Sequence, residues 1–146
     1  MTRLSVDESF VPFSVADGDE LFPNGIFVFN VTRILAHLTH HPNHAELVPV
    51  AVDSFPRWSD CLDDAHVEAA DLTRPIVLAE IAPGSDNVID GHHRLAKARR
   101  QGVDTLPAFR LGATQHVPFL TSVKAYRAFV AYWNGKVEER MEATHG

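Results

Sequence analysis

The chain has little cysteine and no long apolar run. Its single cysteine, Cys61, excludes a disulfide within the chain and is typical of a reducing compartment. No stretch approaches the roughly 20 consecutive apolar residues of a membrane-spanning helix, and the first ten residues lack the apolar core of a signal peptide. The sequence therefore predicts a cytoplasmic protein with no membrane partner.

Positive charge is also in short supply. The chain carries 13 Lys and Arg against 19 Asp and Glu, which gives a formal net charge of −6. This balance argues against a surface that binds nucleic acid everywhere, although it leaves room for one basic patch. The length of 146 residues and the 45% hydrophobic content fit one globular domain over residues 1–146.

The most informative stretch is residues 75–111, which we interpret as the core of the domain. Pro75–Ala82 is an apolar, β-branched run that ends at the turn signal of residues 83–84. A short second strand is predicted at Asn87–Ile89, and Leu106–Phe109 opens a third. The pattern predicts strand, turn, strand, helix and strand in that order.

The helix between these strands is marked at both ends. Asp90 fits its N-cap, because a carboxylate there accepts from free N–H groups of the first turn. Gly91 allows the backbone to come close to a ligand, and Gly102 fits the C-cap of a helix over His92–Gln101. The helix contains no acidic residue and carries four basic ones, Arg94, Lys97, Arg99 and Arg100.

A strand that leads into a glycine-marked helix start is suited to anion binding. The free N–H groups and the positive end of the helix dipole point outward together, and a nearby arginine adds a forked donor. The pattern favours phosphate binding at Gly91. The alternative is an ordinary capped helix with a solvated basic face.

The residues around this helix start resemble the signature of the ParB/sulfiredoxin superfamily. Its members carry a strand, a G-x-x-R signature that opens a helix, and a glycine about a dozen residues further on. Asp90-Gly91-His92-His93-Arg94, Ala98 and Gly102 match that frame, and Pro75-Ile76-Val77 matches the preceding strand. The DGHHR form is similar to that of the free-serine kinases and of several ParB-like proteins. The resemblance covers about a quarter of the chain and implies an α+β fold with a small mixed sheet flanked by helices.

The resemblance also implies a nucleotide-phosphate site. Gly91, His92, His93 and Arg94 would hold the phosphates of a nucleotide such as ATP, ADP or CTP, and Asp90 would orient Mg²⁺ or act on the attacking hydroxyl. We take Asp90 and His92 as candidate catalytic residues. Asp90 as a plain N-cap remains the alternative.

Further site residues are expected upstream. In domains of this superfamily a short helix before the Pro-Ile-Val strand contributes polar contacts to the nucleotide, so the resemblance implies His66 and Thr73. The alternative for His66 is the polar face of a surface helix. A kinase also needs a general base, for which Glu46 and Asp53 are the candidates.

Two specialised activities of the superfamily are not expected. Only about 35 residues follow Leu111, with one amphipathic helix and no helix-turn-helix, so full partition function is not predicted. Sulfiredoxin chemistry needs a thiolate directly before the His-Arg of the signature, and that position is His92 here.

Three classes of function remain open. The first is a small phosphotransferase or nucleoside triphosphatase, in which positioning and charge neutralisation supply most of the catalysis. The second is a non-enzymatic nucleotide-sensing module that switches an interaction with another protein or with a second copy of the chain. The third, ranked last, is a metal-dependent nuclease whose basic run Arg94–Arg100 contacts DNA.

The rest of the chain is predicted from apolar patterning and turn signals. Residues 1–20 are an acidic, partly ordered arm that fits an edge strand. Pro49 places the next strand at a sheet edge or strand start. The predicted elements are a strand at 26–29, a helix at 32–40, a strand at 47–52, a short helix at 64–70, and a last helix from Thr121 or Ser122 to Asn134-Gly135, with a charged tail over 136–146.

One histidine cluster stands apart from the signature. His37 and His41 have the i, i+4 spacing that many metal pairs use on a helix, and His40 and His44 lie beside them. Pro42 breaks the helix before His44, and no cysteine or carboxylate supplies an obvious third ligand. We therefore predict a solvated, polar helix end and no metal site.

Overall fold

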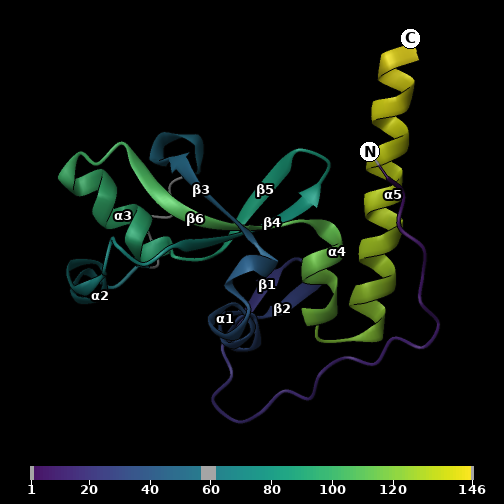
Figure 1. Cartoon of the computed structure of the whole chain (residues 1–146), viewed down its shortest axis with the longest axis horizontal. Helices are drawn as coiled ribbons and strands as arrows, with labels where there is room; N and C mark the ends of the chain where they lie inside the picture. The colour runs from purple at the N-terminus through teal and green to yellow at the C-terminus, as the bar shows by residue number, and fades with distance from the viewer. Residues whose placement is uncertain (1, 57–61, 146) are drawn as a thin grey trace.

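The computed structural model describes residues 2–56 and 62–145, so Cys61 lies outside the described residues. The strands are β1 (Leu21–Asn24), β2 (Phe27–Asn30), β3 (Glu46–Ala51), β4 (Ile76–Ala82), β5 (Ser85–Asp90) and β6 (Thr105–Leu111) (Figure 1). The helices are α1 (Val31–His40), α2 (Asp64–Ala69), α3 (His92–Gln101), α4 (Ala113–His116) and α5 (Val123–His145). Short 3₁₀ turns lie at Pro42–His44, Val52–Ser54 and Val117–Phe119.

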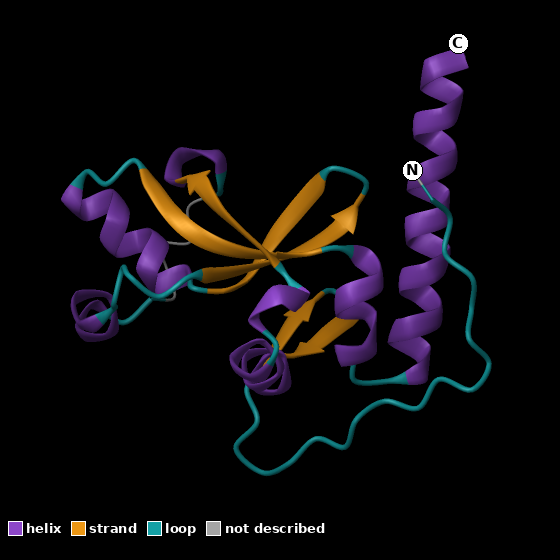
Figure 2. Cartoon of the chain, in the orientation of Figure 1, coloured by secondary structure: helices purple, strands orange, loops and turns teal. Residues whose placement is uncertain are grey.

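The main sheet has four strands in the order β3-β6-β4-β5. β4 is parallel to β6, whereas β3 and β5 run antiparallel to their neighbours. Figure 2 shows α2 and α3 on one side of this sheet and α1, α4 and α5 on the other, with the β1–β2 hairpin beside them. The predicted α+β class, with a small mixed sheet flanked by helices, is confirmed. β3 is an edge strand, as predicted from Pro49.

The central strand β4 is buried on both faces. Ile76 and Leu78 pack with Leu95 of α3 in one apolar cluster. Val77 and Ala79, one residue out of phase, belong to the second cluster on the other face. Successive side chains of a strand alternate between faces, so helices on both sides require an unbroken apolar run. This explains the run from which the strand was predicted.

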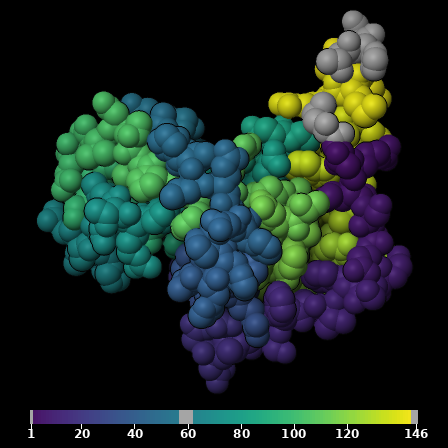
Figure 3. All heavy atoms as spheres, viewed as in Figure 1, coloured from purple at the N-terminus to yellow at the C-terminus, as the bar shows by residue number. Residues whose placement is uncertain are grey.

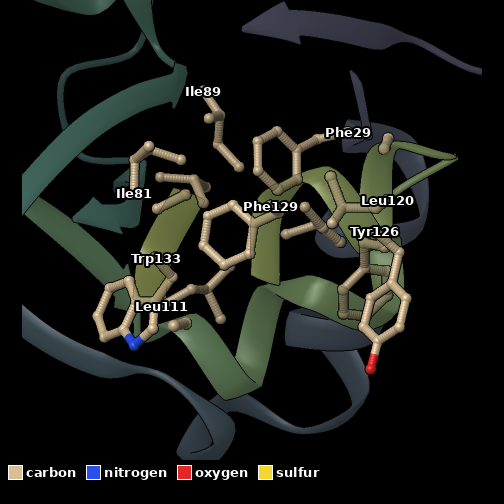
Figure 4. Packing of buried hydrophobic residues seen from close by; sticks show 14 of the residues in the cluster. Phe29, Ile81, Ile89, Leu111, Leu120, Tyr126, Phe129 and Trp133 are labelled. Carbon is tan, nitrogen blue, oxygen red and sulfur yellow. The ribbon is translucent and has the colours of Figure 1, made fainter. Parts of the chain in front are cut away.

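The larger cluster forms where α5 packs on the sheet and on the β1–β2 hairpin. Figure 4 shows the fully buried ring of Phe129 at its centre, among side chains from β2, β4, β5, β6 and α5. Its largest members are Phe29, Ile81, Ile89, Leu111, Leu120, Tyr126, Phe129 and Trp133. None of the helices in the described ranges is both long and apolar enough to cross a membrane.

The last helix is longer than predicted. The expectation that Asn134-Gly135 ends it was wrong, because α5 continues to His145. A glycine inside a helix costs about 1 kcal/mol relative to alanine, but burial of a valine side chain contributes about 2 kcal/mol. Val137, two residues after Gly135, is fully buried, so packing outweighs the local preference.

The N-terminal arm lies along α5 and includes no strand within residues 2–20, so the predicted edge strand was wrong. Leu4 donates its N–H to Asn134 Oδ1 (2.7 Å) and accepts from Asn134 Nδ2 at its carbonyl (2.9 Å). Phe10 stacks on Tyr126 with 4.1 Å between ring centroids. Figure 3 shows the arm in purple against the yellow helix. Side chains of α5 therefore supply the partners that a neighbouring strand would have supplied.

One titratable side chain lies inside the core. His116 of α4 is fully buried and stands edge-on to Phe29 and Phe129. Its Nε2 lies 2.7 Å from the carbonyl oxygen of Glu80, which can only accept, so Nε2 carries the proton. Burial lowers the pKa of His116 to about 4. The imidazole is therefore neutral in the folded protein at neutral pH.

This histidine predicts a loss of stability in mild acid. Below its ordinary pKa of 6.5 the unfolded chain protonates His116, but the folded chain does not until about pH 4. Stability contributed by the neutral form is thus complete above pH 6.5 and falls as the pH drops toward 4. Between about pH 7 and pH 5 we expect a loss of roughly 2 kcal/mol, measured by urea unfolding.

The matched variant is His116→Gln, which keeps a donor for the Glu80 carbonyl but does not titrate. It should show a smaller loss over the same interval by about that amount. An identical pH dependence in the two proteins would rule out His116 as the source.

Candidate functional site

A hollow of about 360 Å³ lies at the start of α3. One wall is the end of α2 with the turn that follows it, and the other is the end of β5 with the first turn of α3. The hollow is lined by His66, Ala69, Ala70, Asp71, Arg74, Asp90, Gly91, His93 and Arg94. Five of the predicted site residues are thus brought together: His66, and Asp90, Gly91, His93 and Arg94 from a segment that begins 24 positions later. Thr73 and His92 do not line the hollow.

Gly91 makes the turn from β5 into α3 possible. Its φ of +112° lies in the left-handed region, which a residue with a Cβ rarely adopts. A Cβ at this position would also lie 2.4 Å from Ile76 Cγ2 of β4. Gly91 therefore allows close contact with the neighbouring strand β4, whereas the sequence predicts close contact with a ligand.

Asp90 does not cap α3, so this prediction was wrong. The N-cap is Gly91, and within the described residues no side chain accepts from the first turn. Asp90 instead faces Arg94, with 3.5 Å between Oδ2 and Nη2, and both side chains are at most 15% exposed. In the first turn of α3, the N–H groups of His93 and Arg94 therefore receive no side-chain cap from the part of the chain that the structure describes.

Arg94 has a structural role. Its Nη1 donates to the carbonyl oxygen of Pro75 at 2.8 Å, directly before β4. Together with the ion pair to Asp90, this contact ties the first turn of α3 to the start of the strand. Arg94 lines the hollow, but its donors are partly used inside the protein.

His66 of α2 and His93 of α3 face each other across the hollow. Their ring centroids are 5.6 Å apart with the planes nearly perpendicular. His66 also lies 3.6 Å from Asp63, the N-cap of its own helix. The two imidazoles can both reach a ligand that enters between the helices.

The turn before β4 carries two residues that sequence reasoning missed. Asp71 Oδ1 accepts from the N–H (2.9 Å) and the hydroxyl (2.6 Å) of Thr73, and these bonds lower the pKa of Asp71. The hydroxyl donor of Thr73 is therefore already used in a hydrogen bond to Asp71. Arg74 donates its backbone N–H to the carbonyl oxygen of Asp71 at 3.2 Å, and its charge also lowers the pKa of Asp71. Its guanidinium lines the hollow without a hydrogen bond or ion pair to any side chain or carbonyl group that the structure describes. The sequence signal that could have indicated Arg74 is its position directly before Pro75, at the start of the signature strand.

His92 is directed away from the hollow. Its ring lies against Phe22 of β1, with 5.5 Å between centroids. Burial lowers the pKa of His92, as does the positive charge of His93 and Arg99, while Asp90 acts in the opposite direction. A role in phosphate binding or catalysis at the hollow does not fit this placement, so that prediction is not supported by the geometry.

The basic face of α3 is not a solvated stripe. Lys97 donates to the carbonyl oxygens of Glu68 and Ala70 at the end of α2, both at 2.8 Å. Arg99 donates to the carbonyl oxygen of Phe55 at 2.6 Å, and Arg100 to Asp64 at 2.7 Å. These cations hold α2 and the 52–56 segment against α3. They leave no continuous basic surface on this helix.

Neither candidate for the general base lies in the hollow. Glu46 begins β3 and pairs in register with Arg110 of β6, two strands away from β5. Asp53 lies in the 3₁₀ turn at Val52–Ser54, which contacts the later part of α3 through Arg99. Glu46 and Asp53 therefore do not line the hollow, and neither is placed to act as a general base there.

A larger cavity of about 680 Å³ lies elsewhere, between the arm, α4 and α5. Its walls are largely apolar and include Tyr126, Val130 and Trp133. Its carboxylate, Glu80, already accepts from the Gly84 N–H at 3.0 Å and faces Arg110 at 3.6 Å. The cavity is larger than the hollow at α3, and the start of α4 lines it. Because α4 has only four residues, its dipole is weaker than that of α3, and the cavity is less suited to a phosphate.

Comparison with known proteins identifies no relative. No protein-family model matches the chain, and neither curated proteins nor solved structures give a significant match. The ParB/sulfiredoxin resemblance therefore stays a prediction that rests on the residues of the signature.

Replacement of Gly91 should destabilise the fold. In Gly91→Ala, the positive φ and the contact with Ile76 should together cost at least about 2 kcal/mol in the free energy of unfolding, measured by urea denaturation. Gly135→Ala is the matched control, because that glycine lies in α5 with open space around its Cβ position. The control should gain about 0.5 to 1 kcal/mol. Equal stability of the two variants would contradict this account of Gly91.

Proposed function

We propose that the hollow at the start of α3 binds the phosphate groups of a nucleotide. One observation carries the proposal: a helix start without a side-chain cap and the guanidinium of Arg74 line the same hollow. The open N–H groups and the positive end of the helix dipole favour a phosphate, and a guanidinium supplies paired donors to its oxygens. His66 and His93 would add ring N–H donors from both walls.

Two carboxylates in the hollow fit a phosphate-bound Mg²⁺. Asp71 and Asp90 both line it, and the lowered pKa keeps Asp71 ionised at neutral pH. Mg²⁺ in nucleotide sites is usually held by one or two carboxylates, with water and phosphate oxygens as its other ligands.

Binding has more support than turnover. Phosphoryl transfer needs chiefly positioning and charge neutralisation, so a phosphotransferase or nucleoside triphosphatase remains the enzymatic form of the proposal. However, the predicted catalytic carboxylate, Asp90, is held in a nearly buried ion pair with Arg94, and His92 points elsewhere. These two observations favour a nucleotide-sensing module that acts through a protein partner or a second copy of the chain. A cytoplasmic location would give such a module access to nucleotides.

A nuclease has less support. Lys97, Arg99 and Arg100, which were to contact the DNA backbone, are engaged with carbonyl oxygens or with Asp64. We do not propose DNA as the partner.

The test is isothermal titration of ATP, ADP and CTP, each with Mg²⁺, into the wild type and Arg74→Ala. Loss of the guanidinium should weaken nucleotide binding at least about tenfold, the usual worth of a charge-assisted hydrogen bond. The matched control is Arg127→Ala, because Arg127 is a half-exposed arginine of α5 that pairs with Glu8 far from the hollow. Arg94 is unsuitable as a probe, since its loss also releases Pro75.

Each outcome decides between the alternatives. No binding by the wild type would overturn the proposal, and equal binding by Arg74→Ala and Arg127→Ala would place the nucleotide elsewhere. Binding that depends on Arg74 supports the site. Release of phosphate or diphosphate during a parallel incubation would then choose the enzyme over the sensing module.

A further inference from the structure

Three imidazoles meet at the end of α1, away from the hollow at α3. The ring centroids of His37 and His41 are 4.9 Å apart, those of His37 and His44 4.6 Å, and those of His41 and His44 5.9 Å. His37 Nε2 lies 2.5 Å from His44 Nδ1. At this distance one of the two ring nitrogens donates a proton and the other accepts it. Both nitrogens therefore face the same small space.

The turn at Pro42 creates this cluster. His37 and His41 are one helical turn apart, and the 3₁₀ turn Pro42–His44 then folds the chain back, with the His44 N–H donating to the His41 carbonyl at 3.0 Å. Gln115 of α4 holds the turn by donating its Nε2 to the His44 carbonyl. The helix break was expected to carry His44 away from the pair. Instead, the turn places the His44 ring within hydrogen-bond distance of the His37 ring.

We propose that His37, His41 and His44 form a binding site for a divalent transition-metal ion of the Zn²⁺ or Ni²⁺ type. Imidazole binds Zn²⁺ through nitrogen at about 2.0 to 2.1 Å, which puts the ring centroid about 3.2 Å from the metal. Two such rings at a tetrahedral angle have centroids about 5.2 Å apart. The three observed separations, from 4.6 to 5.9 Å, bracket this value. Water would complete the coordination.

The ring of a phenylalanine closes one side of the cluster. The ring of Phe119, 5.5 Å from that of His37, covers one side of the cluster.

The ion has to open the cluster slightly. Across the part of the chain that the structure describes, no three potential ligands are already disposed around a metal position. Two nitrogens on a tetrahedral Zn²⁺ lie about 3.3 Å apart, so the His37–His44 separation must widen from 2.5 Å. His41 and His44 are exposed, so rotation of their side chains is enough. The metal thereby replaces the hydrogen bond between His37 and His44.

The experiment is isothermal titration of ZnCl₂, and separately NiCl₂, into the chelator-treated, tag-free chain at about pH 7.5. We expect one equivalent to bind with a Kd of about 10 µM or lower. His41→Ala and His44→Ala should each weaken binding at least about tenfold. His40→Ala is the matched control, because His40 is also exposed and lies on the same helix end but does not belong to the cluster. It should bind as the wild type does.

A second measurement guards against variants that fold poorly. ZnCl₂ should raise the melting temperature of the wild type and of His40→Ala, and should leave that of His44→Ala unchanged. Absence of saturable binding by the wild type would overturn the proposal. So would full binding by His44→Ala, since the helical pair alone would then hold the ion, or an equal loss in His40→Ala. None of these outcomes bears on the nucleotide hollow.

Discussion

The domain depends on the contact between the start of α3 and the start of β4. Gly91 lets α3 leave β5 directly against Ile76, and Arg94 reaches back to the carbonyl oxygen of Pro75. The sheet strand, the helix and the turn at Arg74 are thereby fixed relative to one another. The hollow exists because this junction leaves the first turn of α3 open on one side and Lys97 holds α2 on the other.

Much of the fold could be predicted from local pattern. α3 begins and ends at the predicted residues, because Gly91 and Gly102 both adopt the left-handed conformation that only glycine favours. β4 was predictable because its two faces are both covered. The errors concern partners that are distant in sequence. Local signals predict that α5 ends at Gly135, but packing of Val137 extends the helix. They also predict a strand in the arm, but the arm forms hydrogen bonds to Asn134 of α5 instead.

The candidate site shows the same limit. The sequence contains the donors of residues 90–100 but gives no sign of which acceptors they meet. Arg94, Lys97 and Arg99 were natural choices for a phosphate or a DNA backbone, yet carbonyl oxygens of remote segments take up their hydrogen bonds. Arg74 was missed because its position next to Pro75 does not reveal that its guanidinium faces the hollow. A residue becomes available to a ligand when the fold leaves it unengaged, which is a property of the whole structure.

The docking of the arm on α5 also concerns how the chain folds. Leu4 and Asn134, which exchange two hydrogen bonds, are 130 positions apart. Contacts of such long sequence separation form slowly and carry a large loop-closure entropy. During synthesis, residues 2–10 emerge long before α5 exists, so their apolar side chains wait without a native partner. The arm should therefore dock last, after α5 has packed into the core.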